Sequence, residues 1–301
     1  VLVGRVLQAL GGCTGMLLAR SIVLDQHGRD QAAGLLGYIT IGIASAQALA
    51  PTVGGYLNLT LGWQSVFYLS LAMGSLVWLA AIFYLPETAM PTGKDRGLRQ
   101  LFGSYRTVLN NRAYFYFSLS STLIAACFFA FITSAPFVVD HWLSGSSADY
   151  GNWFLLVAGG FFLGSITAGR ISARLGVYRM IQLGHGLSLL AAVTMLALIG
   201  LQGVNYLALY LPMALFTFGR GLSQPSAQSA AISSTRGAVA TASGLLGFVQ
   251  LLVGAGVAQI TPLAIQLHIA LLPATMVLAS LLALWTYRCG KQASLSPSPQ
   301  P

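Results

Sequence analysis

Two arginines inside strongly apolar segments are the residues of this chain most able to do chemistry. Arg5 follows Gly4 near the start of the chain, and Arg220 follows Gly219. A guanidinium inside a membrane needs a carboxylate, a carbonyl or water beside it, and it can shift the pKa of a neighbouring acid. We therefore expect both arginines to have a function. For Arg5, a structural role with the side chain reaching to the outer surface is the alternative.

Acidic, cysteine and histidine residues offer few further possibilities. The six acidic residues all lie in connecting segments: Asp25, Asp30, Glu87, Asp95, Asp140 and Asp149. An intramembrane enzyme would need paired aspartates, an HExxH helix or a GxSxG serine with a histidine, and the sequence contains none of these. The three cysteines lack CxxC spacing and the histidines stand apart, so we expect no enzyme, no cofactor and no metal site.

The composition is that of an integral membrane protein. Hydrophobic residues make up 56% of the 301 residues and charged residues only 7%, against about 25% charged residues in soluble domains. The formal net charge of +9 does not indicate nucleic-acid binding. The basic residues stand in short loops, where the anionic inner leaflet is the expected partner.

Nine apolar stretches are each long enough to cross a bilayer, which takes about 20 residues. They cover residues 1–24, 34–57, 64–85, 113–139, 152–174, 178–200, 205–232, 238–261 and 266–288. All Lys and Arg residues except Arg5 and Arg220 fall at alternate connections. Because cytoplasmic loops retain basic residues, we predict nine transmembrane helices with Val1 outside and the C-terminus in the cytoplasm.

Residues 86–112 form the longest connection and separate three helices from six. Apolar residues at helical spacing, with Arg99 and Arg106 on the other face, favour a helix lying on the membrane surface. A solvated linker is the alternative. We predict a cytoplasmic linker here, between bundles at 1–85 and 113–290. The Ser- and Pro-rich end of the chain predicts a disordered cytoplasmic tail at 291–301.

A weak internal repeat relates two parts of the chain. The segment GLLGYI at residues 34–39 recurs as GLLGFV at residues 244–249, and a helix containing Gly-Arg precedes each copy. Helical transporters are commonly built from such repeats. Six predicted helices separate equivalent positions, so we expect a parent protein of twelve helices, of which this chain lacks the first three.

The motifs around these positions resemble those of the major facilitator superfamily, and most closely the Bcr/CflA branch of its drug:proton antiporters. The segment RVLQALG, from Arg5, is similar to the signature of the family's fourth helix. A stripe of small residues is similar to the antiporter signature of the fifth helix: Gly42, Ala46, Ala50, Pro51, Gly54 and Gly55. The resemblance implies an all-α fold of two six-helix bundles, proton coupling at Arg5 and a gating role for the stripe.

The superfamily's cytoplasmic loop motif is also partly present. Gly169, Arg174 and Gly176 match it, but Ala173 stands where the motif has an Asp. This departure removes the charge on which a relay would depend. Retention of basic residues on the inner side would explain Arg174 equally well.

Small residues four apart make one face of a helix narrow, so that a second helix can approach closely. The stripe of residues 42–54 forms such a face, and a second is formed by Gly160, Gly164, Ala168 and Ser172. We predict that these two faces pack against each other, and that Pro51 bends its helix by removing a hydrogen bond. Ordinary close packing without gating is the alternative.

A few polar and aromatic side chains are expected to face a substrate cavity. They are Gln8, Gln47, Thr122, Phe129, Thr133, Arg220, Gln224 and Gln250. A mostly apolar pocket with few hydrogen-bonding groups suits amphipathic drug-like compounds better than sugars, which need many paired hydrogen bonds.

Together these patterns and the resemblance indicate a proton-driven efflux pump of the bacterial inner membrane. Its expected partners are an amphipathic small-molecule substrate, protons and the lipid bilayer, and it is expected to be monomeric. A metabolite importer of the same fold and a truncated remnant that cannot transport are the alternatives.

Overall fold

The computed structural model describes residues 3–4, 6–12, 15, 22, 42, 45–84, 98–235 and 238–295. Arg5 and four of the six acidic residues lie outside this set. A helix covers residues 45–61. The helices that follow are α2 (Gln64–Tyr84), α3 (Leu98–Leu109), α4 (Arg112–His141), α5 (Ser147–Leu175), α6 (Val177–Gln202), α7 (Tyr206–Ser233), α8 (Val239–Leu267) and α9 (Leu271–Leu295).

Six of the described helices are long and apolar enough to cross a membrane, namely α2, α4, α5, α6, α8 and α9. The 28-residue helix α7 lies among them and carries Arg220 near its middle. Each segment predicted to span the membrane from residue 64 onward overlaps largely with one of these helices. The protein is therefore a multi-pass, all-helical membrane protein.

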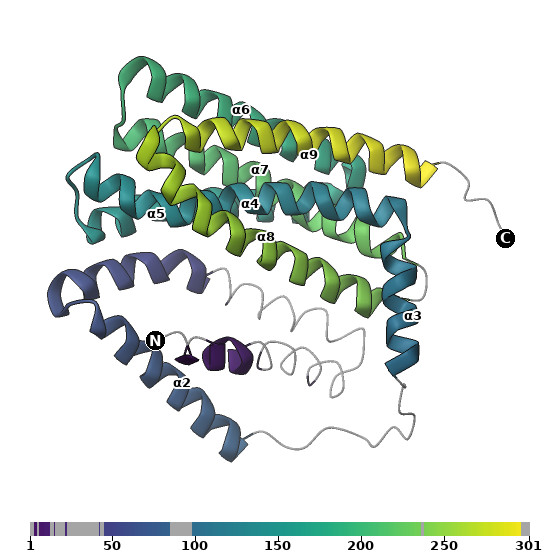
Figure 1. Ribbon diagram of the computed structural model, residues 1–301, viewed down its shortest axis with the longest axis horizontal. Coiled ribbons are helices and arrows are strands. Elements are labelled where there is room, and N and C mark those ends of the chain that lie inside the picture. The colour runs from purple at the N-terminus through teal and green to yellow at the C-terminus, as the bar shows by residue number, and fades with distance from the viewer. Residues whose placement is uncertain are drawn as a thin grey trace. The chain divides into compact units, whose positions relative to one another are not determined.

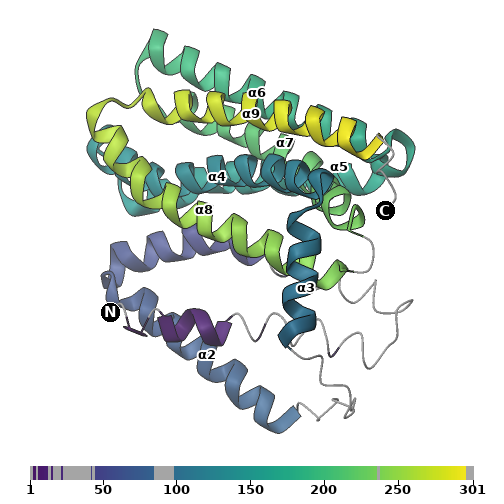
Figure 2. The ribbon, with the colours of Figure 1, turned by 45° about the vertical axis from the view of Figure 1, so that its right-hand side comes forward.

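The chain divides into two compact units, Val1–Leu49 with Trp63–Asp95, and Ala50–Gly62 with Arg96–Pro301. In the second unit, α4 to α9 run side by side (Figures 1 and 2). Helix α7 packs against α5 and α6, and α4 packs against α8 and α9. These six helices, from Arg112 to Leu295, are called the C-terminal bundle below, and the domain bounds predicted from the sequence stay a prediction.

Large apolar and aromatic side chains fill the interior of this bundle. Phe131, Tyr210 and Met213 are fully buried in its main cluster. Towards the start of α7, the Trp153 ring stacks on Tyr206 at a centroid distance of 5.4 Å. Aromatic residues of this kind are enriched at both membrane–water interfaces, so this end of the bundle suits a position at one of them.

Helix α3 runs across the direction of α4 and α9 rather than along it (Figures 1 and 2). Val108 is buried in a cluster with Tyr114 and Ala230, whereas Tyr105 and Arg106 are exposed. The helix predicted within residues 86–112 is present. Its buried contact with the bundle favours a docked helix over a solvated linker.

The last two helices extend beyond their predicted ends. Helix α8 continues to Leu267, past the predicted end at residue 261, and Pro262 lies inside it. Helix α9 continues to Leu295, so residues 291–295 of the predicted tail are helical. A proline within a membrane helix is tolerated where neighbouring groups satisfy the backbone.

A capping box begins α5. The backbone N–H of Asp149 donates to Ser146 Oγ over 3.2 Å, and the backbone N–H of Ser146 donates to Asp149 Oδ2 over 2.8 Å. Each side chain thus satisfies a backbone donor that the helix leaves free. The box fixes the point at which the chain enters α5.

Replacing Ser146 with alanine is expected to lower the free energy of unfolding by about 1 kcal/mol, the usual cost of losing an N-cap. The measurement is thermal unfolding of the purified protein in detergent. Thr167→Ala is the control, because the Thr167 hydroxyl bonds only to the Leu163 carbonyl oxygen of its own helix. Equal unfolding temperatures for the two variants would contradict the prediction.

Candidate functional site

Arg220 lies on α7 between two glycines that let neighbouring helices approach from both sides. A Cβ atom at Gly219 would stand 2.6 Å from the carbonyl oxygen of Gly184 on α6. A Cβ atom at Gly221 would stand 2.6 Å from the carbonyl oxygen of Phe161 on α5. Backbone atoms occupy both spaces, so glycine is required for this close approach. Helices α5 and α6 thereby fix the position of α7 and the direction of Arg220.

The guanidinium of Arg220 is held by two aromatic rings and an amide. Its Cζ atom is 4.3 Å from the centroid of the Phe128 ring on α4 and 5.2 Å from that of the Phe161 ring on α5. Its Nε donates a hydrogen bond to Oε1 of Gln224, one turn along α7, over 2.6 Å. Cation–π contacts contribute about 0.5–2 kcal/mol, but neither the rings nor a neutral amide cancels the positive charge.

No carboxylate pairs with Arg220 in the part of the chain that the structure describes. The two acidic residues there are Asp140, which lies 3.1 Å from His141 at the end of α4, and Asp149, which belongs to the capping box of α5. Arg220 is therefore a partly buried cation whose described neighbours are aromatic and amide groups. A positive charge in such surroundings is unfavourable in free energy unless a further group neutralises it.

The other residues predicted to line a cavity in this bundle make separate contacts. Gln250 on α8 donates to Ser121 Oγ on α4 over 2.9 Å. The Thr133 hydroxyl donates a hydrogen bond to the carbonyl oxygen of Phe129 in its own helix over 2.8 Å. Thr122 is only 1% exposed, so it lies inside the bundle in this structure, and its predicted place on a cavity wall stays a prediction. It lies on the face of α4 that the neighbouring helices cover.

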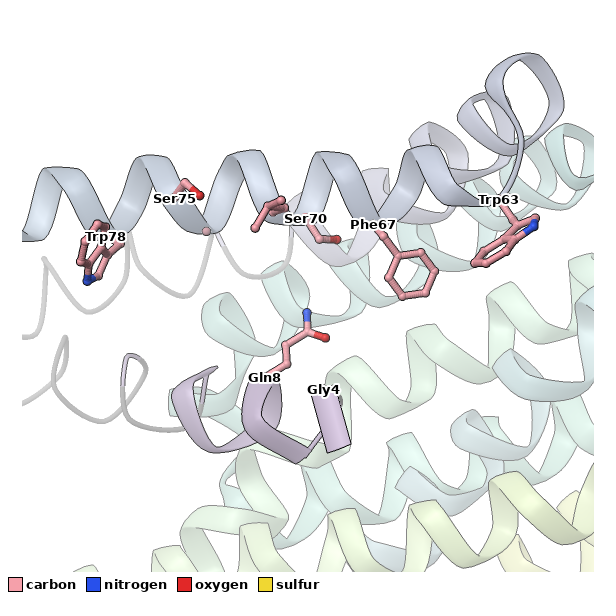
Figure 3. Close-up of a pocket in the computed structure, with 9 residues that line it drawn as sticks. Gly4, Gln8, Trp63, Phe67, Ser70, Ser75 and Trp78 are labelled. Atoms are coloured by element: carbon pink, nitrogen blue, oxygen red, sulfur yellow. The ribbon is translucent and has the colours of Figure 1, made fainter. Parts of the chain in front are cut away.

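A pocket of about 680 Å³ lies within the unit that contains α2. Its wall consists of Gly4, Gln8, Trp63, Phe67, Ser70, Leu71, Gly74, Ser75 and Trp78. Gln8 projects from residues 6–12 towards α2 (Figure 3), and the rings of Trp63 and Phe67 meet edge to face at 5.8 Å. The size and the apolar wall would suit a small amphipathic molecule. Gln47, which is exposed, does not line this pocket.

The internal repeat gives this pocket a different interpretation. By the predicted repeat, residues 1–24 would correspond to α7, and α2 to α9. In the C-terminal bundle, α4 and α6 each contact both α7 and α9. The equivalent space there is therefore filled by packed helices. The surroundings of Arg220, where a charged group, an amide and two aromatic rings meet, form the candidate site.

Polar contacts join the C-terminal part of helix 45–61 to the start of α5. Thr52 Oγ1 donates to the Gly151 carbonyl oxygen over 2.8 Å, and Ser147 Oγ donates to the Gly55 carbonyl oxygen over 3.1 Å. Asn58 Nδ2 donates to Ser147 Oγ over 3.1 Å. A Cβ atom at Gly151 would stand 2.6 Å from the Cα of Thr52. The two backbones therefore touch where these helices meet.

Comparison with known proteins identifies the family. The sequence profile described as Major Facilitator Superfamily matches residues 1–258. The chain belongs to the Major Facilitator Superfamily. This is a family of membrane transporters and not of enzymes, and the match includes both Arg5 and Arg220.

Two relatives of this chain are multidrug transport proteins. The chain is 29% identical to the multidrug transporter MdfA of Edwardsiella ictaluri over 213 residues, which is 69% of this chain and 51% of MdfA. It is 29% identical to the multidrug resistance protein MdtL of Salmonella dublin over 231 residues, which is 74% of this chain and 56% of MdtL. The chain thus spans about half the length of these relatives.

A solved structure shares the fold of this chain. It is a bacterial homologue of the human lysosomal transporter Spinster, with a TM-score of 0.61 and 13% sequence identity. The match covers 93% of this chain and 76% of the other. At this identity the likeness supports the fold alone.

The face of α5 that carries Gly160 and Gly164 packs against α7. This differs from the predicted pairing of that face with residues 42–54. A Cβ atom at Gly160 would stand 2.8 Å from Thr217 Oγ1, and one at Gly164 would stand 3.0 Å from the Cα of Phe218. Spacing by four shows where a helix can be approached but not by which neighbour. The contact with helix 45–61 lies instead at the start of α5.

Only part of the predicted stripe on helix 45–61 makes this contact. The Pro51 carbonyl oxygen would be 2.8 Å from a Cβ atom at Gly151, and a Cβ atom at Gly55 would be 3.0 Å from the carbonyl carbon of Ser147. Ala50 is exposed, and a Cβ atom at Gly54 would meet nothing within 4 Å. Gly42 and Ala46 belong to the other compact unit. Ala168, further along α5, is buried against α6 and α7.

At the predicted loop motif, a single residue connects α5 to α6. Gly176 stands between α5 and α6 with φ of +77°, a conformation that favours glycine. Its N–H donates to the Ser172 carbonyl oxygen over 2.8 Å. Gly169 and Arg174 are exposed. The structure gives Gly176 a backbone role, and the exposed position of Arg174 suits retention of basic residues on the inner side.

Several residues of these sites were not predicted. Phe161 completes the surroundings of Arg220, and Ser147 with Gly151 meets helix 45–61. The sequence did carry one signal for the first. Gly221 directly follows Arg220, and glycines on both sides of a membrane arginine indicate that two helices approach it. Arg5 lies outside the described residues, so its predicted role stays a prediction.

Proposed function

We propose that the protein exports amphipathic small molecules across the bacterial inner membrane in exchange for protons. The observation that carries this proposal is the similarity to two multidrug transport proteins over 69% and 74% of the chain. The arrangement around Arg220 supports it, because a few polar groups stand among apolar and aromatic side chains. Such surroundings suit amphipathic compounds.

In this proposal the Arg5 side chain couples transport to protons by shifting the pKa of an acid beside it. The protein works as a monomer in the lipid bilayer with its C-terminus in the cytoplasm, as the distribution of basic residues suggests. Gln8, Gln47, Gln224 and Gln250 supply hydrogen bonds along the path of the substrate. The sequence similarity to the Bcr/CflA antiporter motifs supports proton exchange as the source of energy.

Alternating access would open and close the contact between helix 45–61 and α5. Pro51 and Gly55 on one side and Gly151 on the other bring the two backbones together without intervening side chains. Hydrogen bonds from Thr52 and Ser147 hold them there. In facilitator folds, transport proceeds by rocking of one bundle against the other around a central site. A contact of this kind would close one side of the transporter.

Transport by the full-length protein in inverted membrane vesicles tests the proposal. A fluorescent amphipathic dye should accumulate in vesicles energised to an acidic interior, and a protonophore should abolish the accumulation. Arg5→Gln should reduce the proton-driven rate about tenfold, a loss of roughly 1.4 kcal/mol of coupling. Arg288→Gln, at the exposed inner end of α9, should leave the rate unchanged. Accumulation that ignores the proton gradient would overturn proton exchange, and movement in the opposite direction would overturn export.

A further inference from the structure

We propose that the Arg220 site binds the carboxylate of a monoanionic aromatic substrate. The proposal rests on the transport function proposed above, because the ligand it names is the transported molecule. It assigns to this chain a preference for organic acids over neutral or cationic compounds of the same shape. Three features of the site carry it: unused donors, an unbalanced charge and aromatic walls.

The first feature is the set of donors on the guanidinium. An arginine has five N–H groups in a rigid planar fork. The Nε–H is used by Gln224, and no hydrogen bond joins either terminal nitrogen to the residues that the structure describes. Two parallel N–H groups on such a fork match the two oxygens of a carboxylate. The bond to Gln224 also restrains the fork, so less freedom is lost when a ligand binds.

The second feature is the charge. Among the described membrane helices of the C-terminal bundle, Arg220 is the basic residue near the middle of its helix, while Arg112, Arg174 and Arg288 lie near helix ends. Of the described acids, Asp140 pairs with His141 at the end of α4, and Asp149 forms the capping box of α5. One negative charge on a ligand would therefore neutralise the site. A dianionic phosphate would leave an excess negative charge among apolar groups, which is unfavourable.

The third feature is the pair of aromatic rings near Arg220. Phe128 comes from α4 and Phe161 from α5, and their centroids are 4.3 Å and 5.2 Å from the Cζ atom. These rings make the immediate surroundings of the guanidinium aromatic and apolar. An aromatic acid could pack its ring there in an offset arrangement. A small hydrophilic acid would leave this surface uncovered.

The experiment compares two probes of equal shape, 2-naphthoate and 2-naphthamide, in binding to the full-length protein in detergent or nanodiscs. The wild-type protein should bind 2-naphthoate about 10- to 100-fold more tightly, as expected for a charge-assisted hydrogen-bonded pair. Arg220→Gln should reduce this preference to less than about twofold, and Arg220→Lys should keep part of it, because lysine retains the charge but not the fork. Arg288→Gln is the control and should keep the full preference.

Each outcome decides the proposal. Equal affinities of the wild-type protein for the two probes would overturn it without any variant, and so would a preference that survives in Arg220→Gln. The first of these results would also be obtained if a carboxylate from another segment already neutralised Arg220. The test is separate from that of export, because binding is measured without a gradient. A preference for 2-naphthoate with no transport would sink the transport function and leave the site in place.

Discussion

Replacing Gly184 with valine is expected to separate α6 from α7 and to destabilise the C-terminal bundle more than any other single change proposed for it. A Cβ atom at this position would stand 2.8 Å from the backbone nitrogen of Ser223 and would overlap the Gly219 carbonyl oxygen. Backbone atoms of a packed helix cannot turn away as a side chain can. We expect a loss of about 3 kcal/mol, at the upper end of the cost of overpacking, and a fall of roughly 10 °C in the unfolding temperature.

The matched control for this prediction is Gly186→Val on the same helix. Gly186 is exposed, and a Cβ atom there would meet nothing within 4 Å. Both variants introduce the same residue into α6, so the difference in helix propensity cancels between them. Thermal unfolding of both purified proteins measures the effect. Similar unfolding temperatures would show that the close approach of α6 and α7 is not required for stability.

The same change should also disturb the candidate site. Gly219 and Gly221 stand on either side of Arg220, and α6 approaches α7 at the first of them. If α6 moves away, α7 can rotate, and the distance from Arg220 to the Phe128 ring will change. The stability of the bundle and the geometry of the binding site therefore depend on the same glycines.

The sequence was sufficient to predict the number and type of helices in the C-terminal bundle because their signals are strong and local. A stretch of about 20 apolar residues leaves few structures other than a membrane helix. The amphipathic pattern of α3 was equally informative, because arginines and apolar residues alternate at the helical period. Helix ends were less predictable. At the end of α8, Pro262 continues the helix where a proline in a soluble protein would often end it.

The partners of individual residues could not be predicted to the same extent. The face formed by Gly160 and Gly164 is visible in the sequence, but its contact with α7 depends on how six helices share one interior. For the same reason Phe161 was not among the residues predicted to face the cavity with Arg220, although Gln224 was. Gln224 is one turn from Arg220 on the same helix, so their contact follows from the helical period alone. Phe161 reaches the arginine from another helix.

A disulfide between helix 45–61 and α5 is expected to stop transport by the full-length protein. Asn58 and Ser147 face each other across this contact, with Asn58 Nδ2 and Ser147 Oγ 3.1 Å apart, so cysteines at these two positions would lie near each other on the two helices. The three native cysteines, Cys13, Cys127 and Cys289, are first replaced with serine. If transport requires this contact to open in every cycle, oxidation of Asn58→Cys/Ser147→Cys should reduce dye accumulation to the level seen with a protonophore, and dithiothreitol should restore it.

Each single cysteine variant serves as a control, since oxidation cannot join one cysteine to a missing partner. The fraction of cross-linked protein, measured by the shift in gel mobility after proteolysis between residues 58 and 147, should match the fraction of activity lost. This proportionality distinguishes a locked transporter from one damaged by the oxidant, which would lose activity in the single variants too. Full transport by completely cross-linked protein would show that helix 45–61 and α5 move together through the cycle, and the moving contact would then have to lie elsewhere in the fold.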